Sequence, residues 1–251
     1  MFQMMKKLLA FLLLIFVFAC AEDSSEFVPN LSGTGVGGSL AKFTISNNQV
    51  IVINGSEVKQ FDILPSDELS EKHTLQIFRQ LETIFPYEDK ILIGSTAAVI
   101  FLGFDADGLL TILSTYDHLT ACDPVVASNG IAFSTLKVTD CRAGSDDLLE
   151  AIDISDIENP TVLKVYSTES PFGLAIRGSS LFVCEKGGLT MYSFNAEGEL
   201  IEMDFLTIDG AVPLDIIANT GYLIVRTTNG IYNVSYSDTA LTGVLGSFIT
   251  D

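Results

Sequence analysis

Several residue types are scarce in this chain, and each shortage argues against a class of protein. The sequence has no tryptophan, two histidines, four cysteines, and 13 lysines and arginines against 32 aspartates and glutamates, for a formal net charge of −19. Nucleic-acid binding needs a basic surface for the phosphates, and this chain has the opposite sign. The cysteines lack the paired Cys-x-x-Cys spacing of a structural zinc site. We therefore expect no nucleic-acid partner, no metal and no other cofactor.

The motifs of common enzyme families are also missing. The sequence has no Gly-x-Ser-x-Gly elbow, no Gly-Lys-Ser/Thr phosphate loop and no His-Glu-x-x-His pair. The glycine-rich run Gly33–Gly38 comes before the first predicted strand and opens no helix, so we interpret it as a flexible linker and not as a dinucleotide loop. No catalytic residue is assigned from motifs.

The longest apolar run is too short to cross a bilayer, which takes about 20 residues. It covers residues 8–18 after two lysines and predicts a signal peptide at 1–19. The sequence Val17-Phe18-Ala19-Cys20 resembles the lipobox of bacterial lipoproteins. This resemblance implies that Cys20 is lipidated and holds the protein at the bacterial outer membrane, periplasmic or surface-exposed, with residues 20–36 as an acidic tether. An ordinary signal peptide with a chance cysteine is the alternative.

From residue 41 onward the sequence predicts an all-β chain, because short β-branched and aromatic runs alternate with Asn-Gly, Gly-Ser-Ser and Thr-Gly turns. Similar strands begin at residues 51, 91, 131, 181 and 222, and a second set begins at 61, 102, 152, 192 and 234. Repeats of about 40 residues with four strands are typical of a β-propeller. We predict a propeller of 37–251 with five blades, at 37–78, 79–119, 120–168, 169–208 and 209–251.

A blade needs a neighbour on each face, so the five units are expected to close into a ring. An open β-solenoid, or a sixth blade completed by residues 27–36, remains as an alternative. The segment Ser66–Phe85 is the best candidate for a helix, but it is equally compatible with a strand, a turn and a strand.

Two segments carry a resemblance to a repeat family. Val58-Lys-Gln-Phe-Asp62 and Leu149-Glu-Ala-Ile-Asp153 resemble the Leu-Val-Ile-Val-Asp pattern of the LVIVD-repeat proteins. The resemblance implies a bacterial surface lipoprotein with a β-propeller, most often of unassigned function. From the residues themselves, Asp62 and Asp153 are expected to cap turns, since a calcium loop would need a denser set of carboxylates.

The third unit is about ten residues longer than its neighbours, and the excess contains Cys141. An antiparallel hairpin centred on Ser128–Gly130 places Cys122 opposite residue 137, four positions from Cys141. We therefore predict a Cys122–Cys141 disulfide, whose Cα separation a short loop can supply. Cys184 lies within an apolar strand and is predicted to be a buried free thiol.

Propeller ligands commonly bind where the innermost strands start, because the rigid ring positions these loops. Three successive units have a proline near this point, and the side chains beside it make Asp123, Phe172 and Asp215 the candidate binding residues. The leading hypothesis is a non-catalytic envelope module that binds a protein or a glycan. The alternative is a polysaccharide hydrolase or lyase that uses Asp123 and Asp215.

Overall fold

The structure is a computed structural model that describes residues 38–117, 124–137 and 146–250, all within the unit Ser32–Asp251. Every regular element in these ranges is a β-strand. The described residues therefore contain no helix of the length and hydrophobicity that a membrane crossing requires.

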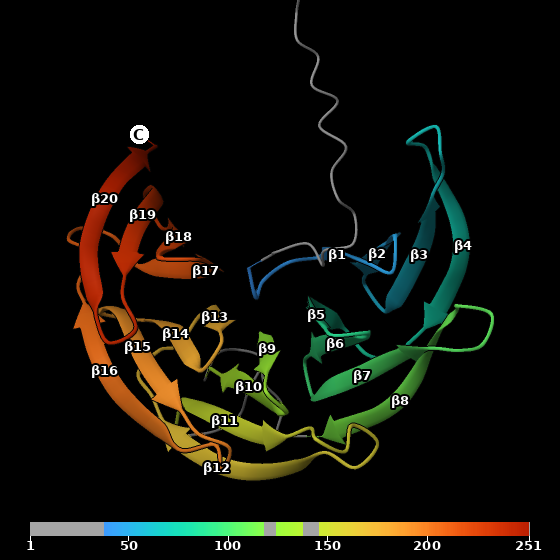
Figure 1. The fold of residues 1–251 in the computed structure, drawn as a ribbon, viewed down its shortest axis with the longest axis horizontal. Coiled ribbons are helices and arrows are strands. Elements are labelled where there is room, and N and C mark those ends of the chain that lie inside the picture. The colour runs from blue at the N-terminus through green and yellow to red at the C-terminus, as the bar shows by residue number, and fades with distance from the viewer. Residues whose placement is uncertain (1–37, 118–123, 138–145, 251) are drawn as a thin grey trace, which may run out of the picture. The chain divides into compact units, whose positions relative to one another are not determined.

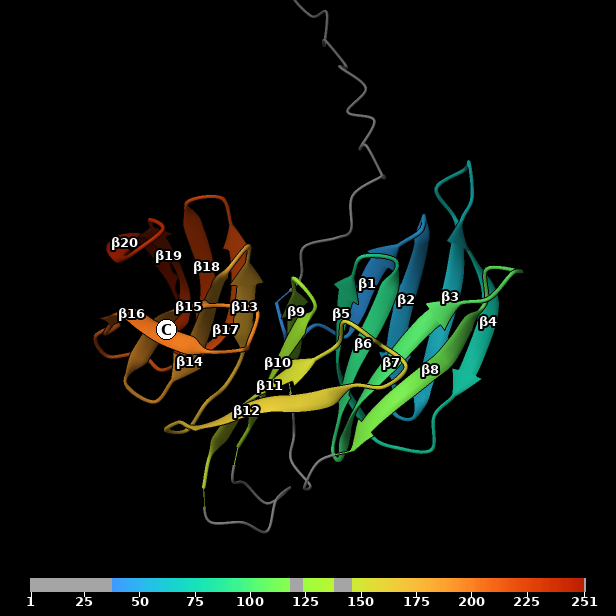
Figure 2. The same cartoon turned by 60° about the horizontal axis from the view of Figure 1, so that its bottom comes forward.

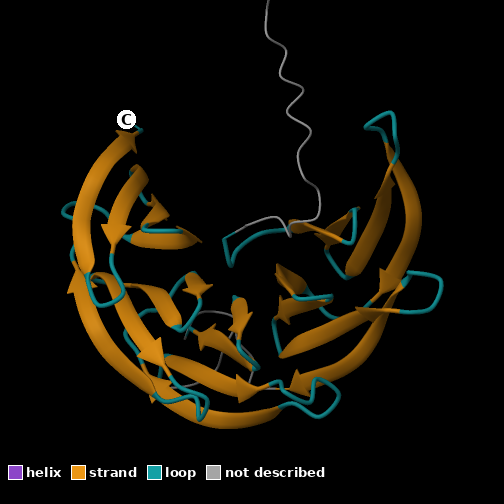
Figure 3. Ribbon diagram, in the orientation of Figure 1, coloured by secondary structure: helices purple, strands orange, loops and turns teal. Residues whose placement is uncertain are grey.

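In the described residues, twenty strands form five antiparallel sheets of four, and within each sheet the strands are neighbours in the order of the sequence. Loops and turns connect the strands (Figure 3). Sheet 1 contains β1 (Phe43–Ser46), β2 (Gln49–Asn54), β3 (Glu57–Ile63) and β4 (Leu69–Gln76). Sheet 2 contains β5 (Leu81–Tyr87), β6 (Lys90–Ser95), β7 (Ala98–Phe104) and β8 (Leu110–Asp117). Sheet 3 contains β9 (Val125–Ser128), β10 (Ile131–Leu136), β11 (Leu148–Asp153) and β12 (Thr161–Ser167). Sheet 4 contains β13 (Leu174–Arg177), β14 (Ser180–Glu185), β15 (Gly188–Phe194) and β16 (Leu200–Leu206). Sheet 5 contains β17 (Pro213–Asn219), β18 (Tyr222–Thr227), β19 (Gly230–Tyr236) and β20 (Leu241–Ile249).

The sheets follow one another around a common centre, with the first strand of each innermost and the fourth outermost (Figures 1 and 2). The innermost strands pack in series, β1 on β5, β5 on β9, β9 on β13 and β13 on β17. This is the arrangement of a five-bladed β-propeller, as the repeat predicted, and the sheets are called blades 1 to 5. The segment Ser66–Phe85 forms strand, turn and strand in place of a helix.

The tight turns between the first two strands of several blades explain the Asn-rich and Gly-rich signals of the sequence. Asn47 and Asn48 join β1 to β2, and Asn129 and Gly130 join β9 to β10. All four residues have positive φ angles, between 51° and 78°. Such two-residue turns match the twist of the strands that they connect, and asparagine and glycine adopt them at the least cost.

A separate apolar core fills each of the four interfaces between consecutive blades. Between blades 3 and 4 the rings of Phe133 and Phe194 meet edge to face, with centroids 4.9 Å apart. Phe182 and Tyr236 make a similar contact of 4.7 Å between blades 4 and 5. Cys184 lies in this last core as a free, fully buried thiol, as predicted, and burial raises its pKa. Blades 2, 3 and 4 are thus held by apolar contacts on both faces, because the side chains of a strand alternate between the two faces of its sheet.

No fifth core joins blade 5 to blade 1 among the residues described. Phe43 on blade 1 is 61% exposed, and Phe248 on blade 5 is 68% exposed. Direct packing of the last blade on the first, which the closed-ring expectation implied, is therefore absent there. The physical reason is that a repeat length sets the number of blades but not the angle between one blade and the next. The segment 27–36, the proposed source of a sixth blade, lies outside the described residues.

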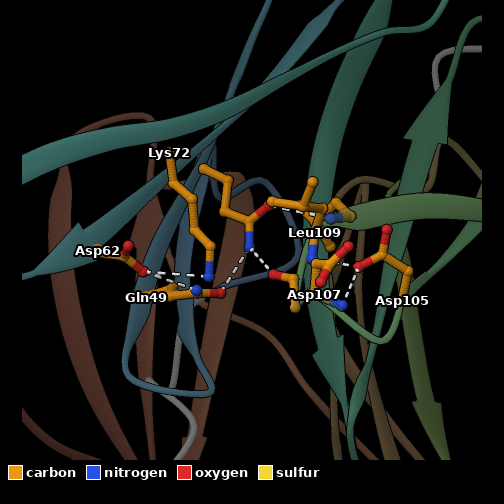
Figure 4. Close-up of polar contacts among 9 residues, drawn as sticks. Gln49, Asp62, Lys72, Asp105, Asp107 and Leu109 are labelled. Carbon is orange, nitrogen blue, oxygen red and sulfur yellow. Dashed lines mark hydrogen bonds and ion pairs between the residues drawn. The ribbon is translucent and has the colours of Figure 1, made fainter.

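A fully buried glutamine makes a polar connection between blades 1 and 2 (Figure 4). Gln60 Nε2 on β3 donates to the Gly108 carbonyl oxygen at 2.6 Å and to Gln49 Oε1 at 2.7 Å. Its Oε1 accepts a hydrogen bond from the Leu110 amide at 3.0 Å. Every polar atom of the amide is thereby used, so the side chain fixes the turn between β7 and β8 against blade 1.

Replacement of this side chain with an apolar one of similar size should destabilise the protein. Gln60→Met leaves the Gly108 carbonyl and the Leu110 amide without these partners in a buried site, which typically costs about 1–3 kcal/mol. Gln76→Met is the matched control, because Gln76 is exposed and its amide bonds only to Ser56. Urea unfolding should give a lower free energy of unfolding for Gln60→Met alone. Equal losses in the two variants would contradict the assigned role.

Candidate functional site

The structure brings together two of the three predicted binding residues. Phe172 precedes β13, Asp215 lies on β17, and the Gly173 amide between them donates to the Leu214 carbonyl oxygen at 3.0 Å. A β-carbon at Gly173 would lie 2.6 Å from Asp215 Oδ1, so only glycine fits this contact. Asp123, Cys20 and the predicted Cys122–Cys141 pair lie outside the described residues, and the predictions for them stay predictions.

Phe172 precedes β13, and its half-buried ring packs against the apolar core between blades 4 and 5. Its amide donates to the Cys184 carbonyl oxygen at 2.8 Å, and its own carbonyl oxygen accepts from Thr135 Oγ1 at 3.0 Å. Lys137 Nζ lies 3.2 Å from the centroid of the Phe172 ring, which is a cation–π contact. Burial lowers the pKa of Lys137, and the charge of Asp147 partly opposes this shift. The pair presents an aromatic ring and a cation together in a strongly acidic protein.

The carboxyl group of Asp215 contacts the segment that leads into β1. This segment, Gly38–Lys42, is called the lead-in segment. Ser39 Oγ donates to Asp215 Oδ1 at 3.3 Å and accepts a hydrogen bond from the Leu174 amide at 2.7 Å. A β-carbon at Gly38 would lie 2.3 Å from Asp215 Oδ2. Gly38 is buried and packed against this carboxylate, so the linker interpretation of Gly33–Gly38 was wrong for this glycine.

Burial is the main influence on the Asp215 carboxyl group and raises its pKa. Hydrogen bonds from the backbone amides of Ile216 and Leu40 act in the opposite direction, as does the charge of Arg226. The balance leaves a carboxyl group that is costly to ionise and that has both oxygens close to the lead-in segment. Asp215 therefore serves first as an attachment point for the chain before blade 1.

The remaining contacts of the lead-in segment reach blades 1 and 2. The Ala41 carbonyl oxygen accepts from the Ile84 amide at 3.0 Å, and the Lys42 carbonyl oxygen accepts from the Ile53 amide at 2.9 Å. Lys42 Nζ also donates to the carbonyl oxygen of Glu82 and lies 3.7 Å from its carboxylate. The lead-in segment thus connects the first two blades to the last two at the centre of the propeller.

The repeated aspartates are architectural. Asp153 Oδ1 accepts from the Ser155 amide at 2.9 Å and from its hydroxyl at 2.6 Å, which is the predicted turn capping. Asp62 differs, because its partners are side chains: Gln49 Nε2 at 2.8 Å and Lys72 Nζ at 3.6 Å (Figure 4). In blade 2, Asp105 caps the turn between β7 and β8, because its Oδ1 accepts hydrogen bonds from the amides of Asp107 and Leu109 (Figure 4). This aspartate does not belong to the repeated sequence motif.

Sequence reasoning missed Lys137 and Ser39. Lys137 directly follows β10 and lies at the same end of the propeller as Phe172. Its position at the end of a predicted strand could therefore have indicated that it lies near Phe172. Ser39 carried no comparable signal, since its partner Asp215 is 176 positions away along the chain. The site that the described residues form is therefore an aromatic and cationic rim beside an occupied carboxylate.

No protein-family model matches this sequence, and no curated protein matches it. Several solved structures do match this chain in fold. A protein from Lactobacillus plantarum has a TM-score of 0.64 at 14% identity, over 81% of this chain and 67% of that one. The periplasmic gluconolactonase PpgL of Pseudomonas aeruginosa has a TM-score of 0.61 at 12% identity, over 81% and 70% of the two chains. AztD from Citrobacter koseri has a TM-score of 0.56 at 13% identity, over 81% and 60%.

The chain is a β-propeller. At these identities the likeness to β-propeller proteins such as the gluconolactonase and AztD shows the fold alone. The chain spans between 59% and 67% of the length of the first three structures that it matches. A propeller of this kind is compatible with binding and with hydrolysis, and the choice between them depends on the residues of the site.

The pH dependence of stability tests the state of Asp215. Its raised pKa means that the folded protein holds the proton more tightly than the unfolded chain, whose aspartates have a pKa of about 3.9. Asp215 therefore makes its whole contribution to the free energy of unfolding at pH values below the pKa of the unfolded chain. This contribution is lost as the pH rises through the pKa of the folded protein. In Asp215→Asn the residue stays neutral, so the free energy of unfolding of the wild type should fall relative to that of the variant as the pH rises.

Urea unfolding of both proteins between about pH 3 and 7 measures this difference. Asp209→Asn, at an exposed carboxylate in the turn before β17, controls for the loss of one negative charge. A wild-type advantage over Asp215→Asn that grows with rising pH would overturn the assignment.

Proposed function

We propose that the protein is a non-catalytic, lipid-anchored propeller of the bacterial outer membrane that binds a protein or a glycan where its innermost strands start. The observation that carries the binding role is the contact of Lys137 with the Phe172 ring. Aromatic rings with a polar or charged partner are preferred anchors in binding surfaces, because they supply a large contact area at a small loss of side-chain entropy. The Thr135 hydroxyl, which binds the Phe172 carbonyl oxygen, fixes the position of this rim.

A binding role agrees better with the state of Asp215 than a catalytic one does. A general acid or base must reach its substrate, whereas this carboxylate is occupied by Ser39 and the backbone of the lead-in segment. The polysaccharide hydrolase or lyase that would use Asp123 and Asp215 remains the second candidate. Its support is the structural likeness to a protein named as a gluconolactonase.

The envelope location is supported by the sequence before the propeller. The Val17–Cys20 lipobox pattern favours lipidation of Cys20, and the LVIVD-like segments at Asp62 and Asp153 agree with a surface lipoprotein. The proposed Cys122–Cys141 disulfide fits an oxidising compartment. Both cysteines lie beyond the described ends of the β9–β10 hairpin, in which Val125 pairs with Ser134, so the disulfide is proposed from the sequence.

Binding at the rim predicts a specific loss in Phe172→Ala. Removal of the ring takes away the contact surface and the partner of Lys137, so affinity for the ligand should fall about tenfold or more. The full chain would be tested on a glycan array and against envelope extract, and any captured ligand would then be titrated. Phe78→Ala is the matched control, because Phe78 is an aromatic residue that is 92% exposed elsewhere on the propeller. Equal affinities of both variants would rule out this rim.

Lipidation predicts a mass change at one residue. Protein extracted from membranes should begin at Cys20 and carry a diacylglyceryl group there, as measured by mass spectrometry of the N-terminal peptide. Cys20→Ala should abolish this modification and release the protein from the membrane fraction. A mature wild-type chain with an unmodified Cys20 would contradict the anchor while leaving the binding rim untouched.

A further inference from the structure

The chain contains three asparagine–glycine sequences, Asn54-Gly55, Asn129-Gly130 and Asn229-Gly230, each at a turn between two strands of one blade. This dipeptide is chemically labile, because glycine has no side chain to hinder its own amide nitrogen from attacking the asparagine side chain. The attack closes a succinimide ring, and it requires that the nitrogen and the side chain can move toward each other. The contacts of each turn therefore decide which of the three sequences reacts.

The turn at Asn129 and Gly130 is held by two neighbouring blades. The Gly130 amide, whose nitrogen would have to attack, donates a hydrogen bond to the Tyr87 hydroxyl of blade 2 at 2.9 Å. Asn129 Nδ2 donates to the Gly178 carbonyl oxygen of blade 4 at 3.3 Å. Both reacting groups are thus engaged with partners outside their own blade.

The turn at Asn229 and Gly230 is held within blade 5. Asn229 Oδ1 accepts hydrogen bonds from the hydroxyl groups of Thr227 at 2.9 Å and Tyr232 at 3.2 Å. A β-carbon at Gly230 would lie 2.1 Å from the Phe248 carbonyl oxygen, so the backbone at this glycine is packed against β20. The side chain and the attacking nitrogen are therefore fixed in place here as well.

The turn at Asn54 and Gly55 has none of these restraints. Both residues are exposed, and within the described ranges neither the Asn54 side chain nor the Gly55 amide forms a hydrogen bond with another residue. A β-carbon at Gly55 would meet no atom within 4 Å. Asn54 is in the last pair of the ladder between β2 and β3, opposite Glu57. Its backbone can therefore rotate toward ring closure with the loss of that pair alone.

We propose that Asn54 is a site of spontaneous modification, at which asparagine is converted to aspartate and isoaspartate. The Gly55 nitrogen forms a bond to the side-chain carbonyl carbon of Asn54, and the bond from that carbon to the side-chain nitrogen breaks. This nitrogen leaves as ammonia and takes the amide proton with it. Water then adds to one of the two carbonyl carbons of the ring and opens it. The product has a carboxylate in place of a neutral amide.

An isoaspartate at position 54 alters the contact between blades 1 and 2. It lengthens the main chain by one carbon atom directly before a turn of two residues, in which Gly55 has a φ angle of 63°. The Gly55 carbonyl oxygen accepts a hydrogen bond from the buried Leu81 at 2.9 Å. The Ser56 carbonyl oxygen accepts one from the buried Ile77 at 2.8 Å. The modification therefore weakens the connection from blade 1 to blade 2.

Peptide mapping by mass spectrometry measures the reaction in the full chain, kept folded in a mildly alkaline buffer with detergent. The peptide with Asn54 should exchange one NH group for one oxygen and separate into two products. Asn129 and Asn229 should react at least about tenfold more slowly, because breaking one hydrogen bond of ordinary strength raises the barrier by that factor. In urea the three rates should become similar, since the dipeptide is the same.

The effect on the blades is tested by urea unfolding of fresh and aged protein. The aged wild type should unfold at a lower urea concentration than the fresh wild type. Asn54→Gln should show no such change, because glutamine closes its larger ring much more slowly. Asn233→Gln is the matched control, at an exposed asparagine that valine follows, and it should lose stability with age as the wild type does.

An Asn54 side chain that stays intact in the aged, folded protein overturns the proposal. So does a rate at Asn54 that is no higher than the rates at Asn129 and Asn229, since the contacts of the turns then have no influence. Conversion of Asn54 without a change in the urea midpoint overturns the assigned effect on blades 1 and 2. None of these results depends on the lipid anchor or on the rim at Phe172.

Discussion

The propeller depends on a small polar contact at its centre, where Ser39 lies between blades 4 and 5. One hydroxyl group binds the Leu174 amide of β13 and the Asp215 carboxyl group of β17. The same short segment then binds Ile84 and Ile53 of the first two blades. The four apolar interfaces hold the blades only in series, so this contact is what joins the beginning of the series to its end. Gly38 and Gly173 are required because no β-carbon fits beside the carboxyl group.

The same arrangement explains which parts of the surface are available for function. Strands with alternating apolar residues form a sheet with two faces to cover, and the inner blades obtain both covers from their neighbours. Blades 1 and 5 obtain one each, so Phe43 and Phe248 remain exposed. At the centre, the lead-in segment occupies Asp215 and leaves the Lys137 and Phe172 rim as the feature suited to a ligand.

Local patterns in the sequence were sufficient for the number and the strand order of the blades, whereas the packing between the last and first blades and the other long-range contacts were not predictable from them. The spacing of similar strands predicted five four-stranded blades, and the apolar strand around Cys184 predicted its burial. Asp153 was correctly interpreted because its partner Ser155 is two residues away. Asp215 was expected to face a ligand, and its partner Ser39 is 176 residues away, a distance at which no local pattern operates. The role of Gln60 was hidden for the same reason, since its partners lie on another blade.

Amide hydrogen exchange tests the central contact most directly. The Leu174 amide has the Ser39 hydroxyl as its partner, and the Leu40 amide binds the Asp215 carboxyl group. Both amides should exchange as slowly as those in β14 and β15, and Ser39→Ala should accelerate exchange at Leu174 before it affects the strands of blade 4. Exchange of both amides in the wild type at the rate of a solvent-exposed turn would show that the lead-in segment does not join the blades.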